Sequence, residues 1–174
     1  QFPHHENEIA QSTCAHGGAP FSRYWLHNGF VNVDHTKMSK SLGNVVLVHD
    51  LLELATGEVV RLALLSAHYR QPLDWSADVL TEARRKLDRL YNALRNVNGW
   101  QDNWQTEAPS ADFIAALEDD INTPRALAAL FNLAREINRM GDTDEAQVCA
   151  RQMRAGAEII GLLGSDPESW FEQG

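Results

Sequence analysis

One short string, Lys37-Met38-Ser39-Lys40-Ser41, has the residue types that bind polyphosphate. Its two ammonium groups can approach the same phosphate chain, while serine hydroxyls and backbone amides supply further hydrogen-bond donors. Leu42-Gly43-Asn44 follows, and a glycine at this point lets the backbone come close to a ligand. On spacing alone, a solvated loop with two exposed lysines explains the string equally well.

A second cluster lies near the start of the chain, in His4-His5-Glu6-Asn7-Glu8. His4 and Glu8 are four positions apart and therefore share one face of a helix. An imidazole nitrogen and a carboxylate oxygen can both ligate Zn²⁺, but a tetrahedral site needs two further ligands from elsewhere. The alternative is an ordinary helix N-terminus whose acidic residues are favoured by the helix dipole, with His5 and Glu6 as surface groups.

The first 75 residues must hold these clusters in short, mixed elements. A helix is expected over 5–16, followed by extended structure over 24–34. The next residues, 34–36, are expected to turn and present Lys37 on the second arm of a hairpin. Val45–Val48 is expected to be a short buried strand or an extended segment. A helix then begins near Asp50, breaks at Gly57 and resumes over 58–68.

The rest of the chain is rich in Ala and Leu at helical spacing. Helices are expected over 76–98, 110–117, 123–140 and 144–163, with a loop over 99–109. Ser76, Ser110 and Thr123 are candidate N-caps, and Pro124 suits the first helical position. Four helices joined by short loops predict an antiparallel bundle, so the fold class is mostly α.

Composition excludes several classes of protein. The chain has 174 residues, 44% of them hydrophobic, and a formal net charge of -9. This is typical of a globular protein, and an acidic chain is a poor candidate for nonspecific nucleic-acid binding. No apolar run is long enough to span a bilayer, and the first residues do not resemble a secretion signal. Cys14 and Cys149 suggest no disulfide framework, so a cytoplasmic location is expected.

The lysine string matches letter for letter the KMSKS signature of class I aminoacyl-tRNA synthetases. Within that class, Phe2–Gln11 resembles the cysteinyl-tRNA synthetases. Further stretches that resemble this family are 24–31, 64–73 and 120–127, so the resemblance covers nearly the whole chain. One departure is His35, which stands where many such enzymes have glycine in the turn before the signature.

The resemblance implies roles for particular residues. Lys40 would contact the phosphates of ATP, bound with Mg²⁺, and Lys37 would position the loop, with Ser39 and Ser41 beside the nucleotide. His4 and Glu8 would be two of four ligands of a catalytic Zn²⁺, the other two being cysteines that precede this segment. Coordination of the substrate thiol by zinc would distinguish cysteine from serine.

The resemblance also implies an organisation. Residues 1–33 would end a Rossmann-type catalytic domain, 34–75 would form a stem-contact fold with the KMSKS loop, and 76–174 would form a tRNA-binding type of helical bundle. The family's first nucleotide-binding half and its anticodon-reading domain are not represented. We therefore expect a fragment that is inactive alone.

The implied function is cysteine–tRNA ligation, with cysteine, ATP and the cysteine tRNA as partners, no membrane partner and a monomeric state. Two alternatives remain open. One is the cysteine–aminosugar ligase of mycothiol synthesis, which resembles the synthetase in these motifs. The other is a non-catalytic, truncated tRNA-binding paralogue.

A basic stretch in the bundle also has two interpretations. It comprises Arg84, Arg85, Lys86, Arg89 and Arg95, with Glu82 and Asp88 among them. Such a stretch is either a solvated helix face with ordinary ion pairs or a surface that contacts tRNA phosphates.

Overall fold

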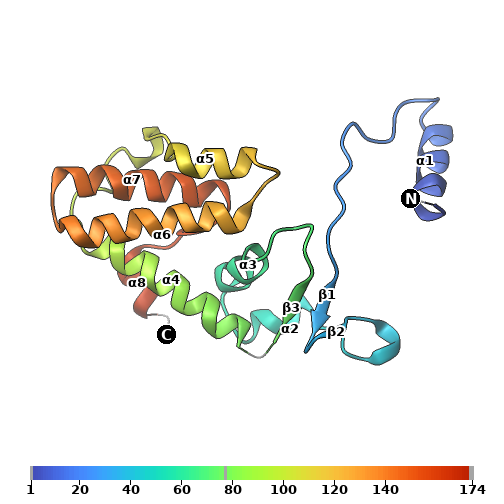
Figure 1. Cartoon of the computed structure of the whole chain (residues 1–174), viewed down its shortest axis with the longest axis horizontal. Helices are drawn as coiled ribbons and strands as arrows, with labels where there is room; N and C mark the ends of the chain where they lie inside the picture. Colours follow the sequence, from blue (N-terminus) through green and yellow to red (C-terminus); the bar gives the residue numbers. More distant parts are fainter. Residues whose placement is uncertain (1, 77, 173–174) are drawn as a thin grey trace.

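A computed structural model describes residues 2–76 and 78–172 of the chain. Figure 1 shows a helical body, a small sheet beside it, and an N-terminal helix, α1 (His4–Ala15), that lies apart from both. The segment between α1 and the sheet is extended, as expected, but only its last residues pair as a strand. The helix predicted over residues 5–16 is confirmed by α1.

Three short strands form the sheet. They are β1 (Val31–Val33), β2 (Thr36–Lys37) and β3 (Leu73–Trp75), in the order β2-β1-β3. The β1–β2 pair is the predicted hairpin, antiparallel, with Val33 opposite Thr36. The β1–β3 pair is parallel, with Val31 opposite Leu73, and was not foreseen. A three-residue strand carries too little pattern to be recognised in a sequence.

Two short helices follow the hairpin, α2 (Val48–Leu52) and α3 (Gly57–Leu65). The strand predicted as one alternative for Val45–Val48 is wrong, since residues 45–47 are unpaired and helix begins at Val48. Both edges of β1 are already occupied by β2 and β3, so β1 offers no edge for a further strand. Val45 and Leu47 are exposed. The other alternative, an extended segment, is the better description of residues 45–47, which are unpaired and end at Leu47 with an extended backbone.

The helical body follows the predicted order closely. Its helices are α4 (Val79–Arg95), α5 (Ala111–Glu118), α6 (Thr123–Met140), α7 (Asp144–Ile159) and α8 (Pro167–Glu172). Two single 3₁₀ turns, η1 (Lys40–Leu42) and η2 (Trp104–Thr106), complete the described elements. The predicted helices at 76–98 and 144–163 prove shorter, and α8 was not foreseen.

Side chains cap the N-termini of α5, α6 and α7, whereas α4 begins after Asp78 without a side-chain cap, so the predicted cap at Ser76 is wrong. The Ser110 hydroxyl accepts a hydrogen bond from the Phe113 amide, as predicted. The predicted cap of α6, Thr123, is wrong: the cap is Asn122, whose side chain accepts a hydrogen bond from the Arg125 amide. Thr143 caps α7 in the same way. Each cap satisfies an amide that the helix itself leaves unpaired.

One continuous core joins the body to the part beside the sheet. α6 packs against α4, α5 and α7, and α3 packs against α4. The core extends from Leu51 to Trp170, and Leu62, Leu87 and Leu130 are fully buried within it. The helical body therefore forms a rigid support for the small sheet that carries the lysine string. Within the described residues, no helix has the length and apolar character required to cross a membrane.

Candidate functional site

The lysine string forms a closed loop rather than a loose one. The Ser39 amide donates to Asn44 Oδ1 at 2.9 Å, and Asn44 Nδ2 donates to the Lys37 carbonyl at 3.4 Å. The Leu42 amide donates to the Ser39 hydroxyl at 3.3 Å, which starts η1. Gly43 then takes a left-handed conformation, with φ of 66°. Asn44 thus bridges the two sides of the loop and holds its shape.

The turn before the loop tolerates His35 because a third strand holds it. Asp34 and His35 have φ of 47° and 62°, the left-handed pair of a two-residue hairpin turn that usually contains glycine. The His35 amide donates to Asp74 Oδ1 at 2.9 Å, and His35 Nδ1 lies 2.6 Å from Asp74 Oδ2. Asp74 lies on β3, so the parallel strand holds the turn in this conformation.

The two lysines of the loop have different surroundings. The Lys37 ammonium lies over the Phe30 ring, 3.9 Å from its centroid, and this cation–π contact fixes its direction. Lys40 is exposed at the start of η1. No carboxylate among the described residues forms an ion pair with either lysine. Both ammonium groups therefore remain available to an anionic ligand.

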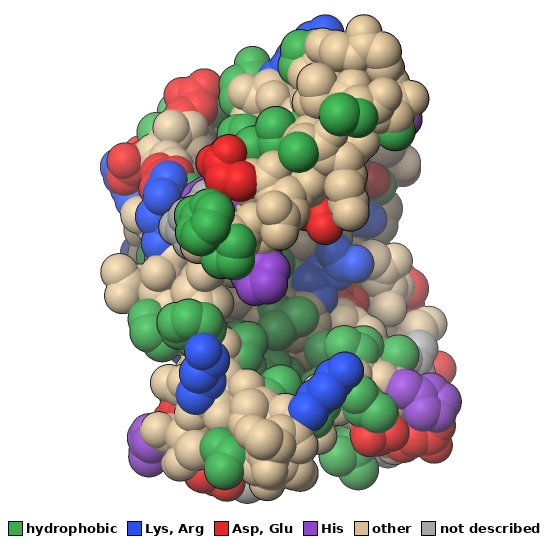
Figure 2. All heavy atoms as spheres, turned by 90° about the vertical axis from the view of Figure 1, so that its right-hand side faces the viewer, with side chains coloured by type: hydrophobic (Ala, Val, Ile, Leu, Met, Phe, Trp, Pro, Cys, Tyr) green, Lys and Arg blue, Asp and Glu red, His purple; other side chains and the backbone are tan. Residues whose placement is uncertain are grey.

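The surface around this loop is open and partly apolar. Exposed hydrophobic residues at or near the loop include Phe30, under the Lys37 ammonium, and Leu42. Figure 2 looks onto this side of the molecule and shows hydrophobic side chains around a hollow, with basic side chains at its rim. Such a surface can receive a ligand or further protein.

The other predicted ligands lie on α1. His4 and Glu8 are both exposed and, four positions apart in one helix, lie on the same face. Their donor atoms suit zinc, so these residues fit as half of a tetrahedral site. Among residues 2–76 and 78–172, no group of three His, Cys, Asp or Glu side chains is placed to hold a metal ion.

His5 has a different environment from His4. Its ring stacks on His27 at 5.0 Å between centroids and lies 5.4 Å from the centroid of Trp25. Desolvation lowers the pKa of His5 below its usual value, and the nearby His27 lowers it further. The His5 ring thus joins α1 to the extended segment that leads to β1. Figure 1 shows α1 well apart from the β1–β2 hairpin, so the structure does not bring the two predicted clusters together.

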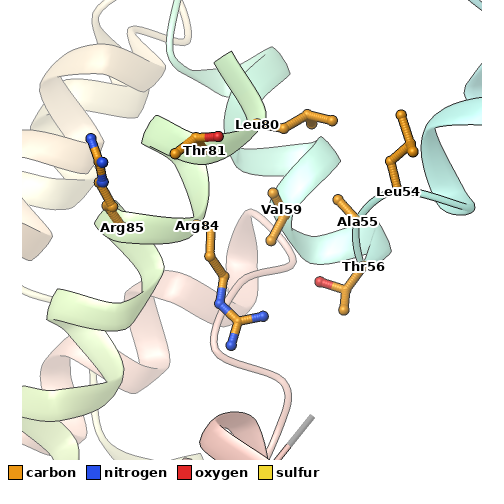
Figure 3. Close-up of a pocket in the computed structure, with 8 residues that line it drawn as sticks. All are labelled: Leu54, Ala55, Thr56, Val59, Leu80, Thr81, Arg84 and Arg85. Atoms are coloured by element: carbon orange, nitrogen blue, oxygen red, sulfur yellow. The ribbon is translucent and has the colours of Figure 1, made fainter. Parts of the chain in front are cut away.

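The basic stretch on α4 is largely paired with acids. Arg84 Nε lies 3.0 Å from Asp88 Oδ1, and Arg85 Nη1 lies 2.9 Å from Glu82 Oε1. Both arginines border a pocket of about 270 Å³ between the start of α3 and α4, shown in Figure 3. Arg95 pairs with Glu168 at 3.0 Å. These contacts favour the interpretation as a helix face with ordinary ion pairs.

Sequence reasoning missed three residues that shape the site: Phe30, Asn44 and Asp74. Asn44 was visible as a polar residue directly after a glycine, a common position for a side chain that closes a loop. Phe30 and Asp74 act through strand pairing and through a contact across the sheet, so only the fold reveals them.

Comparison with known proteins gives the context of this geometry. Residues 1–85 match the family described as the tRNA synthetases class I (C) catalytic domain, and residues 112–164 match the DALR domain. The first match includes the hairpin and the lysine string, and the second lies within the helical body. The chain therefore combines part of a class I tRNA synthetase catalytic domain with a DALR domain.

Individual relatives show which class I synthetases the chain is similar to. The chain is 58% identical to the cysteine–tRNA ligase of Parvibaculum lavamentivorans over 172 residues, 98% of this chain and 36% of that protein. It is 54% identical to that of Maricaulis maris over 171 residues, 98% of this chain and 36% of that protein. For Xanthomonas campestris the identity is 51% over 175 residues, 100% of this chain and 37% of that protein. The chain is a homologue of cysteine–tRNA ligases and spans about a third of their length.

Proposed function

We propose that the protein carrying this chain activates cysteine with ATP and transfers it to the 3′ end of the cysteine tRNA. The observation that supports this most directly is the loop of residues 37–44, which is held by Asn44 and whose two ammonium groups form no ion pair with any described carboxylate. Identity of 51–58% to cysteine–tRNA ligases over nearly the whole chain supports the same function.

In the first step, a carboxylate oxygen of cysteine attacks the α-phosphorus of ATP, and the bond to pyrophosphate breaks. Negative charge accumulates on the departing pyrophosphate, and positioned cations stabilise it without covalent chemistry. Lys40 is proposed to make this contact, with Mg²⁺ bound to the nucleotide. Lys37, directed by Phe30, is proposed to set the position of the loop, and Ser39 and Ser41 to lie beside the phosphates.

In the second step, a ribose hydroxyl of the terminal tRNA nucleotide attacks the carbonyl carbon of the adenylate, and AMP leaves. The body formed by α4–α8 is proposed to bind tRNA. Its rigid core suits a scaffold that holds a large ligand at a fixed distance from the loop.

His4 and Glu8 are proposed as zinc ligands. When bound, zinc would supply Lewis acidity toward the cysteine thiol. The chain's own contribution is the helical spacing that directs both side chains to one side. The two further ligands required by a tetrahedral site are proposed to come from another part of the protein. A monomeric state and a cytoplasmic location remain predictions.

The test is a substrate panel with the full-length protein that carries this sequence. We expect charging of cysteine tRNA with cysteine and no measurable charging with serine. Ligation of cysteine to an aminosugar would instead favour the mycothiol-type ligase. Binding of tRNA without any cysteine-dependent exchange of pyrophosphate into ATP would favour the non-catalytic paralogue.

A further inference from the structure

Two adjacent side chains, those of Tyr69 and Arg70, meet the carboxylate of Asp120, which lies far along the chain in the connection between α5 and α6. The Tyr69 hydroxyl donates to Asp120 Oδ1 at 2.6 Å. Arg70 donates through Nε to Oδ2 at 2.6 Å and through Nη2 to Oδ1 at 3.1 Å. One carboxylate thus accepts a bidentate arginine and a phenol, the geometry of a strong and directional contact.

The backbone at Asp120 adopts an unfavourable conformation to make this contact. Asp120 and Ile121 have φ of 54° and 53°, the left-handed region, which is rare for a β-branched residue such as Ile121. The Ile121 amide bonds to the Leu117 carbonyl at 3.0 Å, and the Asn122 amide to that of Ala116 at 3.1 Å. The connection is therefore held tightly, and it directs the carboxylate at the turn of residues 68–72.

The other side of that turn contacts the hairpin of the lysine loop. The Gly29 amide donates to the Tyr69 carbonyl at 2.7 Å, and the Leu73 amide donates to the Phe30 carbonyl at 2.9 Å. A Cβ at Gly29 would lie 2.3 Å from the Gln71 carbonyl oxygen, so the two backbones meet without space for a side chain. Asp120 therefore contacts a turn that directly adjoins β1.

The exposure of these groups limits their contribution to stability. The side chain of Asp120 is 47% exposed and that of Arg70 is 54% exposed, and ion pairs at such positions add little to the free energy of unfolding. Asp120 nevertheless has its pKa lowered to about 2, chiefly by Arg70 and then by Tyr69. The contact of Asp120 with Arg70 and Tyr69 therefore contributes little to the free energy of unfolding. Its hydrogen bonds are directional, which is what a contact that sets an orientation requires.

We propose that Asp120 is a positioning residue that fixes the orientation of the helical body relative to the hairpin carrying Lys37–Ser41. Packing of α3 on α4 makes one connection between these parts, and the Asp120 contact, with the neighbouring hydrogen bond from the Thr123 hydroxyl to the Ala67 carbonyl, makes a second. Two separate connections prevent a rotation that one alone would permit. This inference rests on the proposed function, in which the body holds tRNA and the hairpin serves ATP.

The test uses full-length protein with Asp120→Asn, which removes the charge but keeps the size. The matched control is Asp119→Asn, since Asp119 pairs only locally, with Arg125 at 3.2 Å, and is similarly exposed. We expect Asp120→Asn to raise the KM for tRNA about tenfold while cysteine-dependent exchange of pyrophosphate into ATP stays within about twofold of wild type. The control should change neither quantity.

A readout independent of activity completes the test. Hydrogen–deuterium exchange over residues 29–44 should become faster in Asp120→Asn and not in Asp119→Asn. The positioning role would be overturned if hydrogen–deuterium exchange over residues 29–44 were unchanged in Asp120→Asn. It would also be overturned if Asp120→Asn lowered pyrophosphate exchange and tRNA charging equally, or if Asp119→Asn had the same effects as Asp120→Asn. An inactive wild-type protein would contradict the proposed function alone, because hydrogen exchange would still decide whether Asp120 holds the hairpin.

Discussion

At the scale of single residues, the lysine loop depends on one amide side chain. Asn44 bonds both to the Ser39 amide and to the Lys37 carbonyl. A Ser- and Gly-containing loop without such a bridge would lose conformational entropy on closing over a ligand. Because Asn44 already orders the loop before a ligand binds, less conformational entropy is lost when the ligand binds.

We therefore predict that Asn44→Ala lowers kcat/KM for ATP about tenfold, as expected when about two hydrogen bonds that order the loop are lost. Steady-state pyrophosphate exchange at varied ATP concentration measures this. Asn44→Asp retains an oxygen acceptor for the Ser39 amide and should be impaired less. Equal activity of Asn44→Ala and wild type would show that the bridge has no catalytic role.

Asp120 gives a pH-dependent prediction at the same scale. Its pKa is about 2 in the folded chain, against 3.8 as the ordinary value, so the folded state favours the ionised form. The contribution to stability is therefore complete above about pH 4 and is lost as the pH falls toward 2. The difference in Tm between wild type and Asp120→Asn should narrow as the pH falls below 4. A difference that widens in acid would contradict this assignment.

At the scale of elements, the small sheet depends on a close approach of backbones. Gly29 has no room for a Cβ beside the Gln71 carbonyl and the Pro72 nitrogen. Gly29→Ala must displace one backbone from the other, and overpacking of this kind costs about 1–3 kcal/mol. Chemical denaturation should detect that loss. Gly164→Ala is the matched comparison and should change stability little, because a Cβ there meets no atom within 4 Å and the backbone is not left-handed.

The same scale shows how far the sequence alone could predict the fold. The bundle helices were predictable because apolar positions such as Leu87, Leu90 and Leu94 recur at helical spacing and are buried as expected. The hairpin and its lysines were predictable from turn and motif signals. β3 was not, and residues 45–48 stayed open between a strand and an extended segment, because strand pairing is decided by distant residues. For the same reason the roles of Asp74 and Asp120 emerge only from the fold.

At the scale of the whole molecule, the C-terminal helix α8 closes the body. The Trp170 ring stacks on Tyr91 at 4.5 Å between centroids, and its Nε1 donates to Asp88 at 2.8 Å. The Arg84 guanidinium lies 4.3 Å from the centroid of the Trp170 ring. Trp170 therefore links α8 to α4 by stacking, by a hydrogen bond and by burial.

We predict that Trp170→Ala destabilises the chain by about 3–5 kcal/mol, since it deletes a large buried ring and leaves Asp88 without that donor. Denaturant unfolding followed by circular dichroism measures the change. Glu172→Ala, an exposed site on the same helix, should stay within about 0.5 kcal/mol of wild type. A loss below about 1 kcal/mol for Trp170→Ala would show that α8 does not help to close the body.

The whole account depends on the exposed ammonium of Lys40 stabilising charge on the departing pyrophosphate. The most direct measurement is cysteine-dependent pyrophosphate exchange into ATP by the full-length protein, wild type against Lys40→Ala. We predict a decrease in kcat of about 10²–10³-fold, the typical effect of removing one group that stabilises a transition state. Lys86→Ala, on α4, should leave the rate unchanged. A Lys40→Ala protein that exchanges pyrophosphate at the wild-type rate would contradict the account.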